Sequence, residues 1–492
     1  MSLIKTLLSA EAALTQKAVR KTCYRHRKLS DEPLVVTLFN LSGEAAAPLV
    51  ICYGTDPEQP QFTVSAEPRN RTSRFTAIQK FAEFIGEYLE PCLALTEVID
   101  QKGQVKTIAE KTPQLITPNS STLSYLEKLG RSVRYLQDRP EHPVPEEICW
   151  LGAHLSWLSD HSKTPGQSVM LSATQLLSSC FATGQSEMEN ENLASLLAWI
   201  SNEEESGLAQ ILKAERAAYG PSPNTDFERE LAPLVEAWTE ADRAGDATLR
   251  IEIEESIAEL AKREILPAYL ATHKAMRLLR QIDEARSVES RWTQDLHSWS
   301  YYAMRCQSGI PTFKRRQDPI RASRNLELWS SALERLEFDE AMDDPLILAE
   351  HDAAGRCLVG RVIDRDMRNK EVKSTNSRES LVPLITIQLT SSTMLLAGEK
   401  VIWTDSTSVK AEVREVRGGE AIIAIMGGHK TGVRAPLIGD DVTFAAISYF
   451  GGPPPQSPEE VPWTHRESID SPSNEGSSKR RAKGALGVSA ED

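Results

Sequence analysis

The feature that most constrains the fold is a series of short strand patterns in residues 355–448. Residues 409–414 alternate apolar with charged side chains, the period of two expected of a strand with one face in water. Gly418 and Gly419 follow, and such a pair supplies the positive φ angles that a tight hairpin needs. Similar apolar runs cover residues 356–363, 381–390, 400–404, 409–416, 421–426 and 441–447.

These strands crowd into a short stretch, so they cannot remain an open sheet. Unpaired strand edges invite aggregation, and proteins avoid this by closing or covering the sheet. We therefore expect residues 349–450 to form a small β-barrel, OB-like or SH3-like in size.

Composition narrows the class of protein. The chain has 492 residues, of which 40% are hydrophobic and 26% charged, an ordinary globular composition with room for several domains. The net charge of −14 argues against a protein that coats nucleic acid or anionic membranes indiscriminately. No apolar run is long enough to span a bilayer, and seven scattered cysteines without a C-x-x-C pair predict reduced thiols. We expect a cytoplasmic protein with no membrane association.

The remainder of the chain predicts three further regions. Residues 1–115 read as a small α+β unit with an N-terminal helix, three antiparallel strands and a second helix. Residues 116–345 show almost continuous helical periodicity and predict a helical domain. Residues 451–492 are rich in Pro, Ser, Glu and Gly and predict a disordered tail. The predicted fold is thus multidomain and mainly α, with an N-terminal α+β unit, a helical body and a C-terminal β-barrel.

The first predicted helix, residues 2–28, ends in a basic cluster. One interpretation is a site for phosphate or an acidic group; the other is a solvated helix end whose cations suit the helix dipole. We favour the second, because a charge run is usually a solvated face. The cluster consists of Lys17, Arg20, Lys21, Arg25, Arg27 and Lys28.

One acidic group could carry chemistry. The sequence contains the residue types of a PD-(D/E)xK nuclease motif: Asp364 or Asp366, followed by Glu371 and Lys373. In such a site two carboxylates hold a divalent ion and the lysine steadies the attacked phosphate. The spacing is short, however, and acid-x-lysine triplets are common by chance. A metal-dependent nuclease or hydrolase is therefore an alternative and not the first hypothesis.

Other motifs weigh against a catalytic assignment. His154 and His161 lie two turns apart on one predicted helix, too far apart for a single metal ion. The glycine-rich residues 426–432 lack the glycine that precedes the lysine of a phosphate loop. We assign no catalytic residue, no metal and no cofactor.

The predicted barrel is locally basic in a chain that is acidic overall. Small barrels bind single-stranded nucleic acid through basic grooves and aromatic stacking platforms, and Trp403 is the barrel aromatic best placed for stacking. The candidate residues for binding nucleic acid or a protein partner are Arg361, Arg365, Arg368, Lys370, Lys373, Trp403 and Lys430.

The sequence supports three hypotheses of function. The first is a non-catalytic cytoplasmic accessory protein, with a helical scaffold and a barrel that engages nucleic acid or a nucleic-acid-processing partner. The second is the metal-dependent nuclease described above. The third is a pure protein-interaction scaffold, which the same barrel pattern would also fit.

Overall fold

The computed structural model describes residues 3–41, 46–99, 103–136, 140, 143–201, 207–217, 219–313, 319–372, 379–427 and 435–447. Twelve α-helices lie in this described part of the chain. Residues 1–313 and 332–450 form one unit, and residues 314–331 and 451–492 are assigned to another. Apart from residues 319–331, the features described below lie in the first unit, in which we call the part before the barrel the body.

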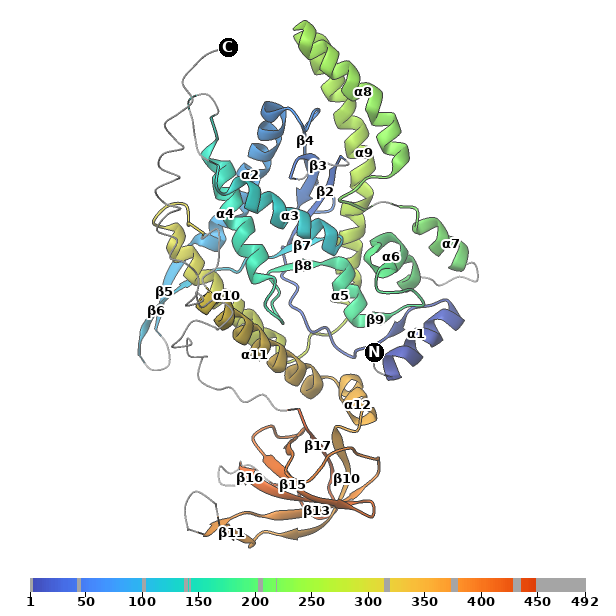
Figure 1. Cartoon of the computed structure of the whole chain (residues 1–492), viewed down its shortest axis with the longest axis vertical. Coiled ribbons are helices and arrows are strands. Elements are labelled where there is room, and N and C mark those ends of the chain that lie inside the picture. Colours follow the sequence, from blue (N-terminus) through green and yellow to red (C-terminus); the bar gives the residue numbers. More distant parts are fainter. Residues whose placement is uncertain are drawn as a thin grey trace, which may run out of the picture. The chain divides into compact units, whose positions relative to one another are not determined.

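A mixed five-stranded sheet forms the centre of the body, in the order β4-β3-β2-β7-β8 (Figure 1). β2 is parallel to β7, which is parallel to β8, whereas β3 is antiparallel to both of its neighbours. The strands are β2 (Leu34–Asn40), β3 (Pro48–Gly54), β4 (Gln61–Val64), β7 (Leu115–Thr117) and β8 (Met170–Ser172).

Helices cover both faces of this sheet, because alternate residues of β2 enter two different cores. Val35 and Phe39 pack with α5 and α9, whereas Val36 and Leu38 pack with α2, α4 and α10. A strand buried on both faces reads as a continuous apolar run, as β2 does. The covering helices are α2 (Arg71–Leu93), α3 (Ser120–Val133), α4 (Glu146–His161), α5 (Ala173–Cys180), α6 (Leu193–Ile200), α8 (Thr225–Ala244), α9 (Ala247–Arg280) and α10 (Val288–Cys306).

The predicted N-terminal unit is present in its parts but is not confirmed as a separate unit. Its three antiparallel strands are β2, β3 and β4, and α2 follows them. The same sheet continues through β7 into β8, which comes from beyond residue 115. The proposed domain boundaries stay predictions.

The predicted helix over residues 2–28 is wrong in its second half. α1 (Leu3–Thr15) ends before Gln16, whose φ of 54° leaves the helical region. β1 (Val19–Arg20) then pairs with β9 (Phe181–Ala182), and the Lys21 N–H donates to the Cys180 carbonyl. Tertiary pairing therefore outweighs local helix propensity in the basic segment.

The remaining elements of the body are short or peripheral. They are the hairpin β5 (Leu95–Ile99) and β6 (Val105–Ala109), the 3₁₀ turn η1 (Glu189–Glu191), α7 (Gly207–Ala214), α11 (Pro319–Asp343) and α12 (Pro345–Ala353). No helix in the described ranges is both long and apolar enough to cross a bilayer.

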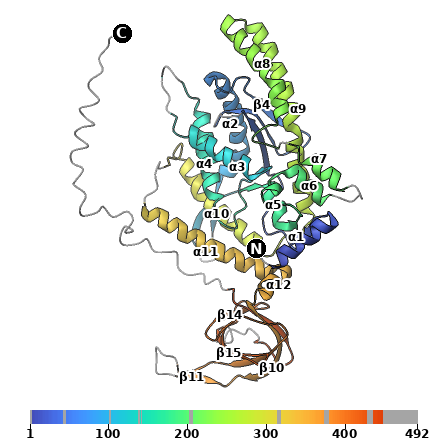
Figure 2. The same cartoon turned by 45° about the vertical axis from the view of Figure 1, so that its right-hand side comes forward.

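The predicted C-terminal barrel is confirmed as a closed, antiparallel six-stranded barrel, in the order β10-β13-β16-β15-β14-β17 (Figure 2). β14, β15 and β16 follow one another as neighbours and β17 returns to pair with β14, which is a Greek-key connection. The strands are β10 (Cys357–Asp366), β13 (Leu384–Leu389), β14 (Lys400–Trp403), β15 (Lys410–Arg417), β16 (Glu420–Gly427) and β17 (Asp441–Ala445).

The predicted strand patterns and turn match these elements closely. Gly418 and Gly419 form the β15–β16 turn with φ angles of 62° and 82°. Inward-facing side chains fill the barrel, among them Leu358, Val413 and Phe444, each fully buried. A second small hairpin joins β11 (Lys370–Val372) to β12 (Glu379–Leu381). The predicted disordered tail, 451–492, lies outside the described residues.

Candidate functional site

The first barrel cation, Arg361, is committed to a neighbour on the barrel surface. Its Nε lies 2.8 Å from Asp441 Oδ1, and a second guanidinium nitrogen lies 3.1 Å from Oδ2. This paired geometry raises the pKa of Arg361 and lowers the pKa of Asp441. An anionic ligand would have to compete with Asp441 for this guanidinium.

Two other described barrel cations are also engaged with the chain itself, whereas Arg368 is exposed. The Lys370 ammonium lies 3.8 Å from Glu379 across the β11–β12 hairpin. An Arg365 guanidinium nitrogen lies 3.2 Å from the Met367 sulfur. Lys373 and Lys430 lie outside the described residues. Binding by this predicted group stays a prediction.

Trp403 belongs to the barrel core. Only 9% of its surface is exposed, and its ring stacks at 6.4 Å from the buried ring of Phe444. A base can stack only on an accessible ring face. Trp403 would therefore have to leave the core before it could serve as a platform.

Two carboxylates of the predicted acidic group have hydrogen-bond partners within the barrel domain. Glu371 Oε2 lies 2.7 Å from a guanidinium nitrogen of Arg414, and Asp366 Oδ1 accepts the backbone N–H of Arg368 at 2.9 Å. Over the described residues, no three His, Cys, Asp or Glu side chains gather as metal ligands would. The nuclease alternative stays a hypothesis, since Lys373 lies outside the described residues.

The loop between β13 and β14 displays two apolar side chains that the sequence analysis missed. Met394 is 80% exposed and Leu396 71%, while Leu395 between them is buried in the barrel core. The Met394 N–H donates to the Gly355 carbonyl at 2.9 Å, and the Leu396 N–H donates to Glu399 at 2.8 Å. An apolar run in a short polar loop is the signal that could have revealed them.

In the body, we would expect a ligand to bind at the carboxyl ends of the neighbouring parallel strands β2 and β7. Chain connections leave these two parallel strands in opposite directions, and open α/β sheets bind ligands at such switch points. Here the chain fills the place itself. The Asn40 N–H donates to the Pro221 carbonyl at 2.8 Å, and the Asn119 amide donates to the Gly220 carbonyl at 2.8 Å.

Close packing and a carboxylate complete this filling. A Cβ on Gly220 would lie 2.5 Å from the Leu38 carbonyl oxygen, so only glycine fits there. Beside it, Glu191 accepts the Ser120 N–H at 2.9 Å at the start of α3 and the Thr174 hydroxyl at 3.2 Å in α5. An internal anion thus occupies the position that a bound anion could take.

The two histidines of α4 have structural partners. His154 is 4% exposed, and its Nδ1 lies 2.9 Å from the Tyr302 hydroxyl, which places the hydroxyl as donor to a neutral ring. Burial lowers the pKa of His154 to about 4. His161 lies 2.8 Å from Asp295. His154 thus packs in the core, and His161 is the last residue of α4.

No protein-family model matches the sequence, and no curated protein matches it.

Proposed function

We propose that the chain is a non-catalytic accessory protein, whose body is a scaffold and whose barrel, OB-like or SH3-like in size, docks a protein partner. The partner we favour is part of a nucleic-acid-processing assembly, in keeping with the local basic character of the barrel. Cytoplasmic localisation is part of the same proposal.

The observation that carries this proposal is the loop that displays Met394 and Leu396. Apolar side chains fixed on an ordered backbone lose little entropy on binding, and they gain about 1.5–3 kcal/mol each when fully buried by a partner. Buried apolar anchors of this kind dominate the energy of protein interfaces.

Two further observations favour a protein partner over direct nucleic-acid binding. Arg361 and Lys370 already lie against carboxylates, so phosphate binding must displace Asp441 and Glu379. The ring of Trp403 is buried and offers no stacking face as it stands. Both features lower the affinity of the barrel for a nucleic acid. Neither lowers its affinity for a partner that binds the apolar loop.

The filled switch point supports a scaffold role for the body. The carboxyl ends of β2 and β7, where a substrate could otherwise bind, are covered by Gly220, Pro221 and Glu191. This arrangement stabilises the body and leaves binding to other surfaces.

The test compares partner capture by the full chain and by two variants. Met394→Ser combined with Leu396→Ser should weaken partner binding by about 100-fold or more, given the apolar area lost. Met188→Ser, at an 86% exposed methionine of the body, is the matched control and should bind as the native chain does. Equal affinity of all three proteins for the purified partner would contradict the proposal.

The nucleic-acid alternative has its own measurement. Fluorescence anisotropy with labelled single- and double-stranded DNA and RNA should show no binding at moderate salt. Binding that weakens with salt, with a log–log slope of about −0.7 per phosphate contact on single strands, would favour the alternative. In that case alanine at Arg365, Arg368 and Lys370 together should flatten the slope.

A further inference from the structure

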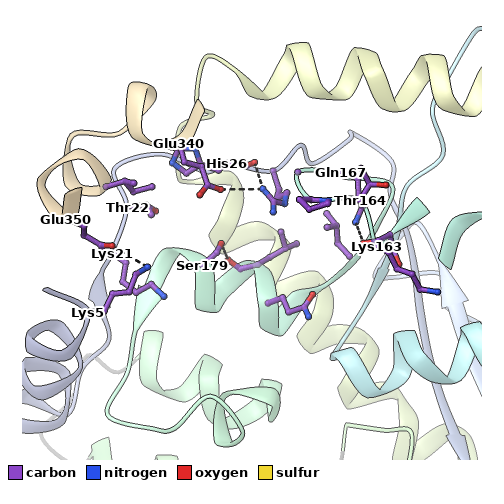
Figure 3. Close-up of a pocket in the computed structure, with 18 residues that line it drawn as sticks. Lys5, Lys21, Thr22, His26, Lys163, Thr164, Gln167, Ser179, Glu340 and Glu350 are labelled. Carbon is purple, nitrogen blue, oxygen red and sulfur yellow. Dashed lines mark hydrogen bonds and ion pairs between the residues drawn. The ribbon is translucent and has the colours of Figure 1, made fainter. Parts of the chain in front are cut away.

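The body contains a cavity of about 440 Å³ that the proposed function does not use (Figure 3). Its wall is assembled from α1, the basic segment after it, the loop before β8, α5, and the helices α11 and α12. A volume of this size is typical of sites for small molecules. Apolar side chains such as Leu176 and Ile347 line part of the wall beside the polar ones.

The cavity lining holds one cation without a carboxylate partner among the described residues, because Lys163 is paired at 3.0 and 3.3 Å with Glu127 and Asp160 outside the lining. The lining includes Lys5, Lys21, Arg27 and Lys163 against the carboxylates of Glu340 and Glu350. Lys5 lies 3.3 Å from Glu350, and Arg27 lies 3.6 Å from Glu340, so these two carboxylates already have cations. Figure 3 shows Lys5, Lys21, Lys163 and the two glutamates around the same space.

Lys21 is the cation that still needs a counter-ion. Its ammonium donates to the Ser178 carbonyl at 2.5 Å, but no carboxylate of the described residues lies within ion-pair distance. Burial, and then the nearby charge of Lys5, lower the pKa of Lys21. A half-buried ammonium beside another cation gains from any anion that enters the cavity.

Two more polar groups in the wall have unused hydrogen-bonding capacity. The Thr22 hydroxyl and His26 Nδ1 are buried, and neither has a hydrogen-bond partner among the described residues. Thr22 is 7% exposed and His26 8%. Buried polar atoms without partners are costly, so each marks a position where a ligand group can bond after a small side-chain adjustment.

The hydrogen bond of His26 with Asp344 determines which ligand group the other ring nitrogen can bind. Its Nε2 faces Asp344 Oδ2 at 3.4 Å, which places the ring proton there and leaves Nδ1 as an acceptor in the neutral ring. Asp344 is held in turn by the N–H groups of Cys23 and Tyr24 at 2.7 and 3.0 Å. The cavity therefore offers an ammonium and a hydroxyl to an anion, and an acceptor to a ligand hydroxyl.

We propose that this cavity binds a small phosphorylated, hydroxyl-bearing molecule, with Lys21 as the counter-ion of the phosphate and Thr22 and His26 as hydrogen-bonding partners. A phosphate suits a wall that holds a part-buried ammonium without a described carboxylate partner better than a neutral ligand does. The cavity does not include the barrel loop that carries Met394 and Leu396. The ligand proposal can therefore be tested independently of partner docking.

The test is calorimetric titration of the full chain with three probes: inorganic phosphate, ribose 5-phosphate and ribose. We expect ribose 5-phosphate to bind at one site, more tightly than inorganic phosphate, and ribose not to bind. Lys21→Gln should weaken ribose 5-phosphate binding at least about tenfold, while Lys17→Gln, in the same basic segment but outside the cavity wall, should not. Failure of both phosphates to bind, or equal binding by Lys21→Gln, would overturn the assignment.

Thr22→Val keeps the test decisive if Lys21→Gln fails to fold. Valine has the shape of threonine and removes only a hydroxyl without a described partner, so the thermal midpoint of the free protein should not fall. The gain in midpoint with ribose 5-phosphate should shrink. Ser156→Ala removes another buried, unpartnered hydroxyl, outside the cavity wall, and is the control that should keep the full gain. An unchanged gain in Thr22→Val, or equal affinity for phosphate and ribose 5-phosphate, would contradict the proposal.

Discussion

In the body, Asp344 and Arg291 are almost fully buried and each holds several partners, whereas in the barrel Arg361 and Asp441 pair at the surface. Arg291 donates to Asp339 and Ser287 at 2.7 Å and to the His26 carbonyl at 3.0 Å. Buried charges are costly unless fully paired, and they therefore fix the geometry around them. Exposed pairs contribute little to stability.

This comparison explains the different roles that we propose for the two regions. Asp344 ties the basic segment to the start of α12, because its carboxylate accepts the N–H groups of Cys23, Tyr24 and Leu346. Burial alone would raise the pKa of Asp344, but these hydrogen bonds and the one with His26 outweigh burial and lower it. The cavity wall is thus held rigidly, as a binding site requires.

The largest expected effect comes from removing this buried carboxylate. Asp344→Ala removes a buried carboxylate and leaves two part-buried N–H groups and the α12 N-cap without an acceptor, and it should cost about 3–5 kcal/mol of unfolding free energy. Asp344→Asn retains one acceptor oxygen and should cost less. Urea denaturation measures both, and a loss below about 1 kcal/mol in Asp344→Ala would show that the buried network does not stabilise the body.

The second expected effect is a loss of stability in acid that originates in the body. His154 has a folded pKa of about 4, against about 6.5 unfolded, so between these values only the unfolded chain takes up the proton. Stability should therefore fall as the pH drops below 6.5, by about 2–3 kcal/mol from this residue at pH 4.5. His154→Gln, which keeps an acceptor for Tyr302, should remove that part of the pH dependence.

Urea denaturation of both proteins at pH 7 and pH 4.5 measures this difference. Burial is also the main reason that the pKa of His273 is lowered to about 4. His273 therefore contributes a pH dependence of stability that is the same in both proteins. Identical pH dependence in the native chain and in His154→Gln would contradict the assignment of a neutral buried imidazole.

The two regions also differ in how far the sequence predicts them. The barrel strands alternate between core and solvent and are joined by short turns, so local patterns such as residues 409–414 and the Gly418–Gly419 turn were sufficient. Their closure into a barrel followed from the need to cover strand edges. The six-strand Greek key required the pairing of β17 with β14 and β10, which no local pattern reveals.

The body resisted prediction for the opposite reason. β7 and β8 have three residues each and pair in parallel with strands far away in the chain, so they carry almost no local signal. The basic segment after α1 looked helical because its neighbours in space, Cys180 and Asp283, are distant in sequence. The interpretation of its cations as a solvated helix end was wrong for Arg25, which is 7% exposed and lies against Glu284.

The smallest expected effect sharpens the comparison from the barrel side. Asp441→Ala releases Arg361 from a surface pair, and the thermal midpoint should not change measurably, because both side chains are largely exposed to water and salt. The freed guanidinium should, however, make the barrel more attractive to anions. Anisotropy of a labelled single strand at low salt would then show weak binding in Asp441→Ala that is stronger than in the native chain, while Asp441→Ala with Arg361→Ala should return to the native level. A large fall in the midpoint of Asp441→Ala would mean that the barrel, like the body, depends on its charged side chains for stability, and the contrast between the two regions would fail.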